Sequence, residues 1–128
     1  MSGKRNSVLI IDDEPANIMM LRQILSPEYV VYVATDGQTG LTVAMKQKPD
    51  VILLDILMPN MDGFEVLTEL RKSDETNEIP VLVVTGLKNE ESEEKALSLG
   101  ANDYMSKPLN SVIFRHRVRN LFKLVARA

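Results

Sequence analysis

Short apolar runs alternate along the whole chain with longer segments that have the period of a helix. The runs cover residues 8–11, 29–34, 51–54 and 81–84, with a weaker one around residues 103–105. Three of them are almost wholly apolar, which is typical of parallel strands that helices cover on both faces. The alternation therefore predicts an α/β fold, a doubly wound five-stranded parallel sheet with five helices and right-handed crossovers.

Signals for helix ends lie between these runs. Pro15 suits the first position of a helix after an acidic turn. Gly100 suits the residue that follows a fourth helix, and Asn110 suits the cap of a fifth. We expect the fifth helix to bury an apolar stripe formed by Val112, Ile113, Val118, Leu121 and Leu124.

Length and composition exclude several classes of protein. The 128 residues fit one domain with a hydrophobic core, and the net charge of −3 is too small to indicate a polyanionic partner. With no cysteine, disulfides and thiolate zinc sites are excluded. No apolar run approaches the roughly 18 residues that span a bilayer, and the apolar stretch after the basic residues 1–5 is too short for a signal peptide. We expect a cytoplasmic protein without membrane contact.

Polar residues follow the ends of the predicted strands. Asp12 and Asp13 follow the first strand, Asp55 the third, Thr85 the fourth and Lys107 the fifth. Ligands of such sheets bind beyond the carboxyl ends of the strands. Clustered carboxylates repel one another unless a cation neutralises them, and an all-oxygen ligand set favours Mg²⁺. A carboxylate beside Mg²⁺ can attack a phosphoryl group, whose oxygens a Lys and a Thr can stabilise.

One geometric condition applies to the first pair of acids. Neighbouring residues on a strand point to opposite faces, so Asp12 and Asp13 share a site only if the chain has already turned there. The segment Glu14-Pro15 favours such a turn.

Four segments resemble the receiver domains of two-component response regulators. They are residues 10–15 (IIDDEP), 54–63 (LDILMPNMDG), 84–86 (VTG) and 107–108 (KP), and their order and spacing match that family. The resemblance covers essentially the whole chain. It implies a flavodoxin-like sheet of strand order 2-1-3-4-5. Residues 1–128 then form a single receiver domain, either by itself or as the excised N-terminal part of a longer regulator.

The resemblance also implies roles for individual residues. Asp55 would accept a phosphoryl group from a partner histidine kinase or histidine phosphotransfer protein, and Thr85 and Lys107 would contact that group. The Lys107-Pro108 bond would be cis. Such a domain is not an enzyme with an external substrate, since it catalyses only its own phosphorylation and dephosphorylation. The cofactor would be Mg²⁺, held by Asp12, Asp13, Asp55 and the backbone carbonyl of Leu57.

A switch is implied as well. Thr85 would turn its hydroxyl toward the new phosphoryl oxygens, and Tyr104 would turn inward on the fifth strand; the alternative, that Tyr104 is only an amphipathic edge residue, stays open. Leu57 and Leu87 should border the site, and neither can hydrogen-bond a hydrolytic water. We therefore expect slow dephosphorylation through exclusion of water.

Charge is unevenly distributed in the second half of the chain. The last helix carries five basic residues and no acid: Arg115, Arg117, Arg119, Lys123 and Arg127. Residues 73–95 carry seven acids: Asp74, Glu75, Glu78, Glu90, Glu91, Glu93 and Glu94. Either these surfaces pair in a homodimer through helix four, strand five and helix five, or they are two solvated helix faces. The end of the last helix resembles helices that lead into a C-terminal output domain. Direct binding of nucleic acid is not expected, since no helix-turn-helix partner is present.

Rival interpretations are weaker on motif. The chain has neither a G-x-x-x-x-G-K-[ST] loop nor a G-x-G-x-x-G turn. A haloacid-dehalogenase-type phosphatase needs a second acid where Leu57 stands, and a flavodoxin would not explain the acids and Lys107. A pseudo-receiver that acts only as an interaction module remains the alternative function. We expect Asp62 to form a turn and helix cap, and His116 to be a surface residue.

Overall fold

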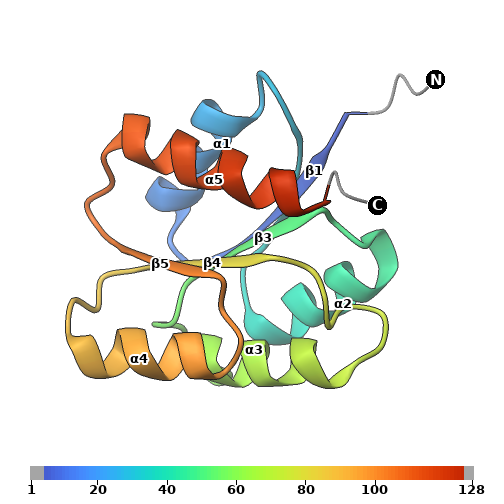
Figure 1. Ribbon diagram of the computed structural model, residues 1–128, viewed down its shortest axis with the longest axis vertical. Helices are drawn as coiled ribbons and strands as arrows, with labels where there is room; N and C mark the ends of the chain where they lie inside the picture. Colours follow the sequence, from blue (N-terminus) through green and yellow to red (C-terminus); the bar gives the residue numbers. More distant parts are fainter. Residues whose placement is uncertain (1–4, 126–128) are drawn as a thin grey trace.

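The computed structural model describes residues 5–125, in which five strands alternate with five helices. Lys4 in the basic N-terminal segment and Arg127 of the predicted last helix lie outside the described residues. The elements are β1 (Ser7–Ile11), α1 (Pro15–Leu25), β2 (Val30–Ala34), α2 (Gly37–Gln47), β3 (Val51–Leu54), α3 (Gly63–Lys72), β4 (Val81–Thr85), α4 (Glu90–Ser98), β5 (Asp103–Ser106) and α5 (Ser111–Val125). The strands form one parallel sheet in the order β2-β1-β3-β4-β5 (Figure 1), which confirms the predicted fold.

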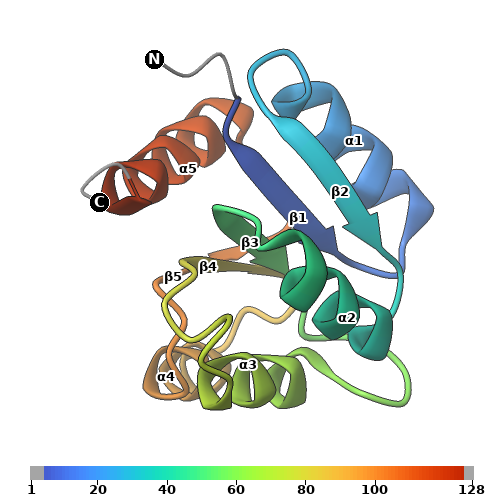
Figure 2. The same cartoon turned by 90° about the vertical axis from the view of Figure 1, so that its right-hand side faces the viewer.

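Helices cover both faces of this sheet. α1 and α5 lie on one face, and α2, α3 and α4 lie on the other (Figures 1 and 2). β1 serves both layers: Leu9 and Ile11 pack in the core beneath α2, α3 and α4, whereas Val8 and Ile10 pack beneath α1 and α5. Burial on both faces is the reason that the central strands are continuously apolar.

The predicted helix ends agree with the structure. Asn110 Oδ1 accepts the backbone N–H groups of Val112 and Ile113, each at 3.0 Å, at the start of α5. Gly100, just beyond α4, has a φ of 109°, which disfavours any residue with a Cβ atom. Asp62 caps α3 through a reciprocal capping box, so its predicted role as a cap is confirmed.

The predicted buried face of α5 was wrong in part. Val118 and Leu121 are buried, and Phe114 and Phe122 are buried with them. The Phe122 ring stacks on Tyr29 with ring centroids 4.5 Å apart. Aromatic side chains bury more apolar area than aliphatic ones, so the two Phe residues set the rotation of the helix. The remaining members of the predicted stripe are exposed: Val112, Ile113 and Leu124.

Two further expectations concern the surface. His116 is exposed on α5, as predicted. Among residues 5–125, every helix is too short or too polar to cross a bilayer.

Candidate functional site

Because all five strands are parallel, their carboxyl ends meet at one edge of the sheet, here called the carboxyl edge. β1 and β3 end directly before Asp12 and Asp55, β4 ends at Thr85, and β5 ends directly before Lys107. The backbone N–H of Lys107 donates to the carbonyl of Thr85 at 2.8 Å, which ties the ends of β4 and β5 together. The amino edge is the opposite one, where the strands begin.

The turn required at the first acids is present. Asp12 Oδ1 accepts the backbone N–H of Glu14 at 2.9 Å, so the chain has left the strand when it reaches Asp13. Asp12, Asp13 and Asp55 each offer one carboxylate oxygen, and these oxygens all lie within 4.8 Å of one another. The structure therefore brings together the three acids that the sequence placed at separate strand ends.

Asp55 is held firmly in this group. Its side chain is buried, and its backbone N–H donates to the carbonyl of Ile11 at 3.0 Å. Its Oδ1 accepts the backbone N–H of Leu57 at 3.1 Å. A Cβ atom at Gly63 would collide with the carbonyl oxygen of Asp55 and with Ile56. Only glycine lets the start of α3 approach the peptide of Asp55 this closely.

Lys107 supplies positive charge to the cluster. Its Nζ lies 3.2 Å from Asp55 Oδ2, 3.3 Å from Asp12 Oδ2 and 3.2 Å from Glu14 Oε1. Burial tends to lower the pKa of the Lys107 ammonium, but the attraction of Asp55 and Asp12 outweighs it and the pKa is raised. Lys107 is therefore a fixed cation at neutral pH. The Lys107-Pro108 peptide bond is cis, as predicted.

One ammonium does not balance these acids. Burial raises the pKa of Asp12, and repulsion by Asp55 adds to the rise, while hydrogen bonds from Glu14 and Lys107 oppose it. The oxygens grouped here belong to carboxylates, the donors that a hard divalent cation prefers. The residues present therefore fit Mg²⁺. The Leu57 carbonyl stays a predicted ligand.

Thr85 and Tyr104 both contact one residue of the loop between β4 and α4. Thr85, fully buried, accepts the N–H of Leu87 on Oγ1 at 3.4 Å. The hydroxyl of Tyr104 donates to the carbonyl of Leu87 at 2.9 Å. Only 7% of Tyr104 is exposed, so its ring occupies the inward position in this structure.

Glu14 was not among the predicted site residues. Glu14 was predicted only to form part of the turn before Pro15, yet its carboxylate binds Lys107. The signal was present: Glu is a poor helix cap, and here it stands directly before α1 and makes no side-chain cap.

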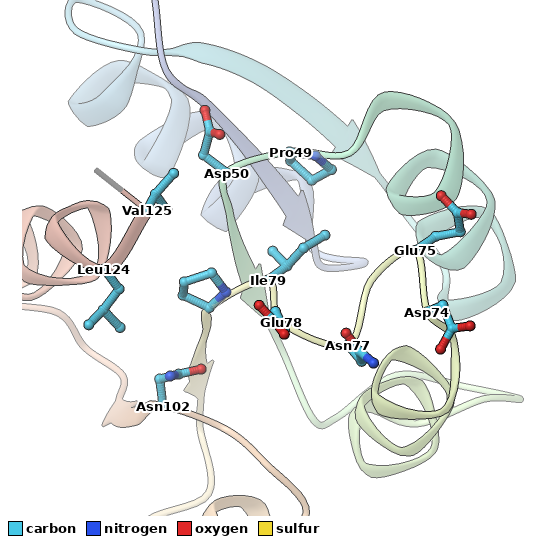
Figure 3. Close-up of a pocket in the computed structure, with 11 residues that line it drawn as sticks. Pro49, Asp50, Asp74, Glu75, Asn77, Glu78, Ile79, Asn102, Leu124 and Val125 are labelled. Carbon is cyan, nitrogen blue, oxygen red and sulfur yellow. The ribbon is translucent and has the colours of Figure 1, made fainter. Parts of the chain in front are cut away.

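A groove at the amino edge has a different character. It has a volume of about 580 Å³, and its lining includes Asp50, Glu78, Asn102 and Leu124 (Figure 3). None of the residues that line it belongs to the cluster of acids at the carboxyl edge. This groove is therefore separate from the candidate site, which the converging charges at the carboxyl edge identify.

The chain belongs to the response regulator receiver domain family, whose pattern matches residues 8–119. It is similar to the response regulator PleD of Caulobacter vibrioides, with 42% identity over 121 residues, which make up 92% of this chain and 27% of PleD. Protein PilH of Pseudomonas aeruginosa is 38% identical over 104 residues, which cover 80% of this chain and 86% of PilH. The solved structure of the Vibrio cholerae chemotaxis protein CheY4 has a TM-score of 0.86 and 29% identity, covering 91% of this chain and 98% of CheY4.

Proposed function

We propose that this receiver domain is a phosphorylation-dependent signalling switch in which Asp55 accepts a phosphoryl group in a Mg²⁺-dependent reaction. The donor would be a partner histidine kinase or a histidine phosphotransfer protein. The observation that supports this most directly is the convergence of Asp12, Asp13 and Asp55 with the ammonium of Lys107 at the carboxyl edge. One carboxylate in that group can act as the nucleophile while the others hold a cation.

The chemistry assigned to the chain is a single displacement at phosphorus. A carboxylate oxygen of Asp55 forms the new O–P bond, the bond from phosphorus to the imidazole nitrogen of the donor breaks, and its electron pair stays on that nitrogen. Lys107, already 3.2 Å from Asp55, stabilises the negative charge of the transferred group. Mg²⁺, when bound by Asp12, Asp13, Asp55 and the Leu57 carbonyl, would neutralise charge on the phosphoryl oxygens.

The same proposal includes the switch. The new oxygens on Asp55 offer an acceptor to the Thr85 hydroxyl, which would then turn away from the Leu87 N–H. A change at Leu87 would alter the loop that leads into α4, and Tyr104 is bonded to the same residue. The face formed by α4, β5 and α5 would carry this change to an output domain or a separate effector.

A homodimer through that face would use the basic side chains of α5. Some of these side chains already form ion pairs within one molecule. Arg117 lies 3.6 Å from Asp103, and Arg119 lies 3.4 Å from Glu28. Arg115 and Lys123 remain exposed and available to the acidic α4 of a second copy. Sedimentation with and without beryllofluoride distinguishes phosphorylation-biased dimers from two solvated faces, for which the mass would not change.

The central test is mass spectrometry after incubation with acetyl phosphate and Mg²⁺. We expect one phosphoryl group per chain, mapped to Asp55, no modification of the Asp55→Asn variant, and none of the wild type without Mg²⁺. An unmodified wild type would instead support a pseudo-receiver that binds partners without phosphorylation. The domain would act on no substrate but itself, and we place it in the cytoplasm with its kinase.

A further inference from the structure

Glu14 stands at the start of α1 but does not cap it. Its backbone is extended, with φ of −96° and ψ of 114°, yet its side chain accepts no backbone N–H of the helix. The carboxylate reaches Lys107 Nζ instead, at 3.2 Å, and accepts a hydrogen bond from Asn17 Nδ2 at 2.5 Å. Asp, Asn, Ser and Thr are the residues that cap helices well. The side chain of Glu14 therefore joins Lys107 to the Asn17 side chain of α1 and caps no backbone N–H of that helix.

The charges of the site balance without Glu14. Three carboxylates, from Asp12, Asp13 and Asp55, are offset by the single charge of Lys107 and the two charges of a divalent cation. The carboxylate of Glu14 is then a surplus negative charge on the solvent side, since its side chain is 62% exposed. Every phosphodonor that approaches Asp55 is itself an anion.

We propose that Glu14 is a specificity-determining residue that disfavours free, highly charged phosphodonors and so favours transfer from a docked protein. The inference rests on the proposed phosphorylation of Asp55. A protein donor can offset the repulsion through its interface with the receiver, whereas a small donor has no such contacts. Glu14 acts on the incoming anion directly and also positions Lys107, which gives one of its N–H groups to Glu14 and not to the phosphoryl group.

The geometry sets the size of the effect. Glu14 Oε1 and Asp55 Oδ2 both lie 3.2 Å from the same nitrogen, so the two oxygens are at most twice that distance apart. This separation is shorter than the Debye length of about 8 Å at physiological salt, so the repulsion is only partly screened. Because Glu14 is exposed, solvent weakens it, and we expect a change in rate of about threefold to tenfold.

The experiment compares two small donors of different charge. Phosphorylation rates of the wild type and Glu14→Gln are measured with acetyl phosphate, a dianion near neutral pH, and with phosphoramidate, which carries less net charge. We expect Glu14→Gln to speed the reaction with acetyl phosphate about threefold to tenfold, the reaction with phosphoramidate less, and both gains to shrink in high salt.

Two control variants separate local charge from other effects. Glu78→Gln changes the net charge equally but lies at the amino edge (Figure 3), so the ratio of the two donor rates should stay at the wild-type value. Glu14→Asp keeps the charge on a shorter side chain and should largely keep the wild-type ratio.

A second measurement requires no phosphodonor. In calorimetry, Mg²⁺ should bind Glu14→Gln about twofold or more weakly than the wild type, because a negative charge beside the acids is lost. The rate of phosphorylation by acetyl phosphate, measured at saturating Mg²⁺, should instead be higher for this variant. A structural defect would lower both quantities. If both donors label the wild type and Glu14→Gln leaves their ratio unchanged, this inference is wrong and the phosphorylation of Asp55 stands. If neither donor labels the wild type, both proposals fail.

Discussion

The two edges of one sheet use polar side chains for opposite purposes. At the amino edge, Asp50 Oδ2 accepts the backbone N–H of Ser7 at 2.8 Å, and Asn102 Oδ1 accepts that of Val81 at 2.9 Å. At the carboxyl edge, the acids face one another and Lys107. Side chains at the first edge complete the hydrogen bonding of strand ends, whereas those at the second are only partly compensated by the protein.

This difference shows how a site can be distinguished from a structural cap. An Asp that accepts a backbone N–H is satisfied by the fold and requires no ligand. Asp12 accepts such a bond too, yet its pKa is raised because it is buried beside another carboxylate. Where buried carboxylates repel one another and the protein does not neutralise them, the structure indicates a place for a cation and a reactive group.

The sharpest test of this comparison replaces one Asp at each edge with Asn. Asp55→Asn should abolish phosphorylation by acetyl phosphate, because an amide oxygen is not a nucleophile for phosphorus. Asp50→Asn should leave the rate unchanged and lower the free energy of unfolding by about 1 kcal/mol, because it weakens a charge-assisted bond to Ser7. Mass spectrometry and chemical denaturation measure the two effects. Loss of labelling in both variants would contradict the division between the edges.

The next largest effect should come from Arg71, which binds backbone near the amino edge. Its guanidinium donates to the carbonyl of Gly100 at 2.8 Å and to that of Ile79 at 2.9 Å. Arg71→Met leaves these partly buried carbonyls without the guanidinium donor. We therefore expect the free energy of unfolding to fall by about 2–4 kcal/mol. Denaturation by urea measures this change.

Arg71→Lys is the matched control. A single ammonium lacks the planar fork of a guanidinium, so it should recover only part of the lost stability. Equal stability of the wild type and Arg71→Met would show that these contacts contribute nothing.

Asp12→Asn should change stability in the opposite direction. Burial and the nearby Asp55 raise the pKa of Asp12 above its ordinary value of 3.8. The folded state then binds the proton more tightly than the unfolded chain, so the free energy of unfolding falls as the pH rises from 3.8 through the raised pKa. Without metal at pH 7, Asp12→Asn should be more stable than the wild type, and its Mg²⁺ affinity should fall by about tenfold or more.

Urea titrations in the presence of a chelator, run between pH 4 and pH 7, measure this effect. The wild type should lose stability relative to Asp12→Asn as the pH rises through that range. Parallel pH profiles for the two proteins would contradict the unfavourable burial of Asp12.

The smallest expected effect concerns the lifetime of the phosphorylated state. Leu57 is 53% exposed, and its Cδ1 would lie 3.9 Å from a Cβ atom at Gly86, so it borders the loop after β4. A double variant, Leu57→Asn with Leu87→Glu, offers a water polar partners that Leu lacks. We expect phosphoryl loss to become about tenfold faster. The measurement is the decay of the labelled protein after the donor is removed. Equal decay in both proteins would remove the hypothesis of water exclusion.

Most of the fold and the main site residues could be predicted from the sequence. Apolar runs give the strands, parallel strands place their carboxyl ends on one edge, and Asp12, Asp55 and Lys107 follow those ends directly. Such a prediction needs only the position of a residue relative to a strand end.

The remainder depends on side-chain reach and packing. Lys107 meets Glu14 across 93 positions of sequence, and Arg71 meets Gly100 across 29. No local pattern encodes either contact. The buried face of α5 was misplaced because apolar residues surround much of that helix, and the packing of Phe114 and Phe122 decides among them.

The paired attachment of Leu87 has a consequence for how this loop can respond. Its N–H and its carbonyl are bonded to different side chains, Thr85 and Tyr104, which stand on neighbouring strands. Removal of one bond leaves the other in place, so two chemical events are needed to detach the segment fully. We therefore expect Thr85→Ala and Tyr104→Phe each to leave one of the two bonds to Leu87 in place.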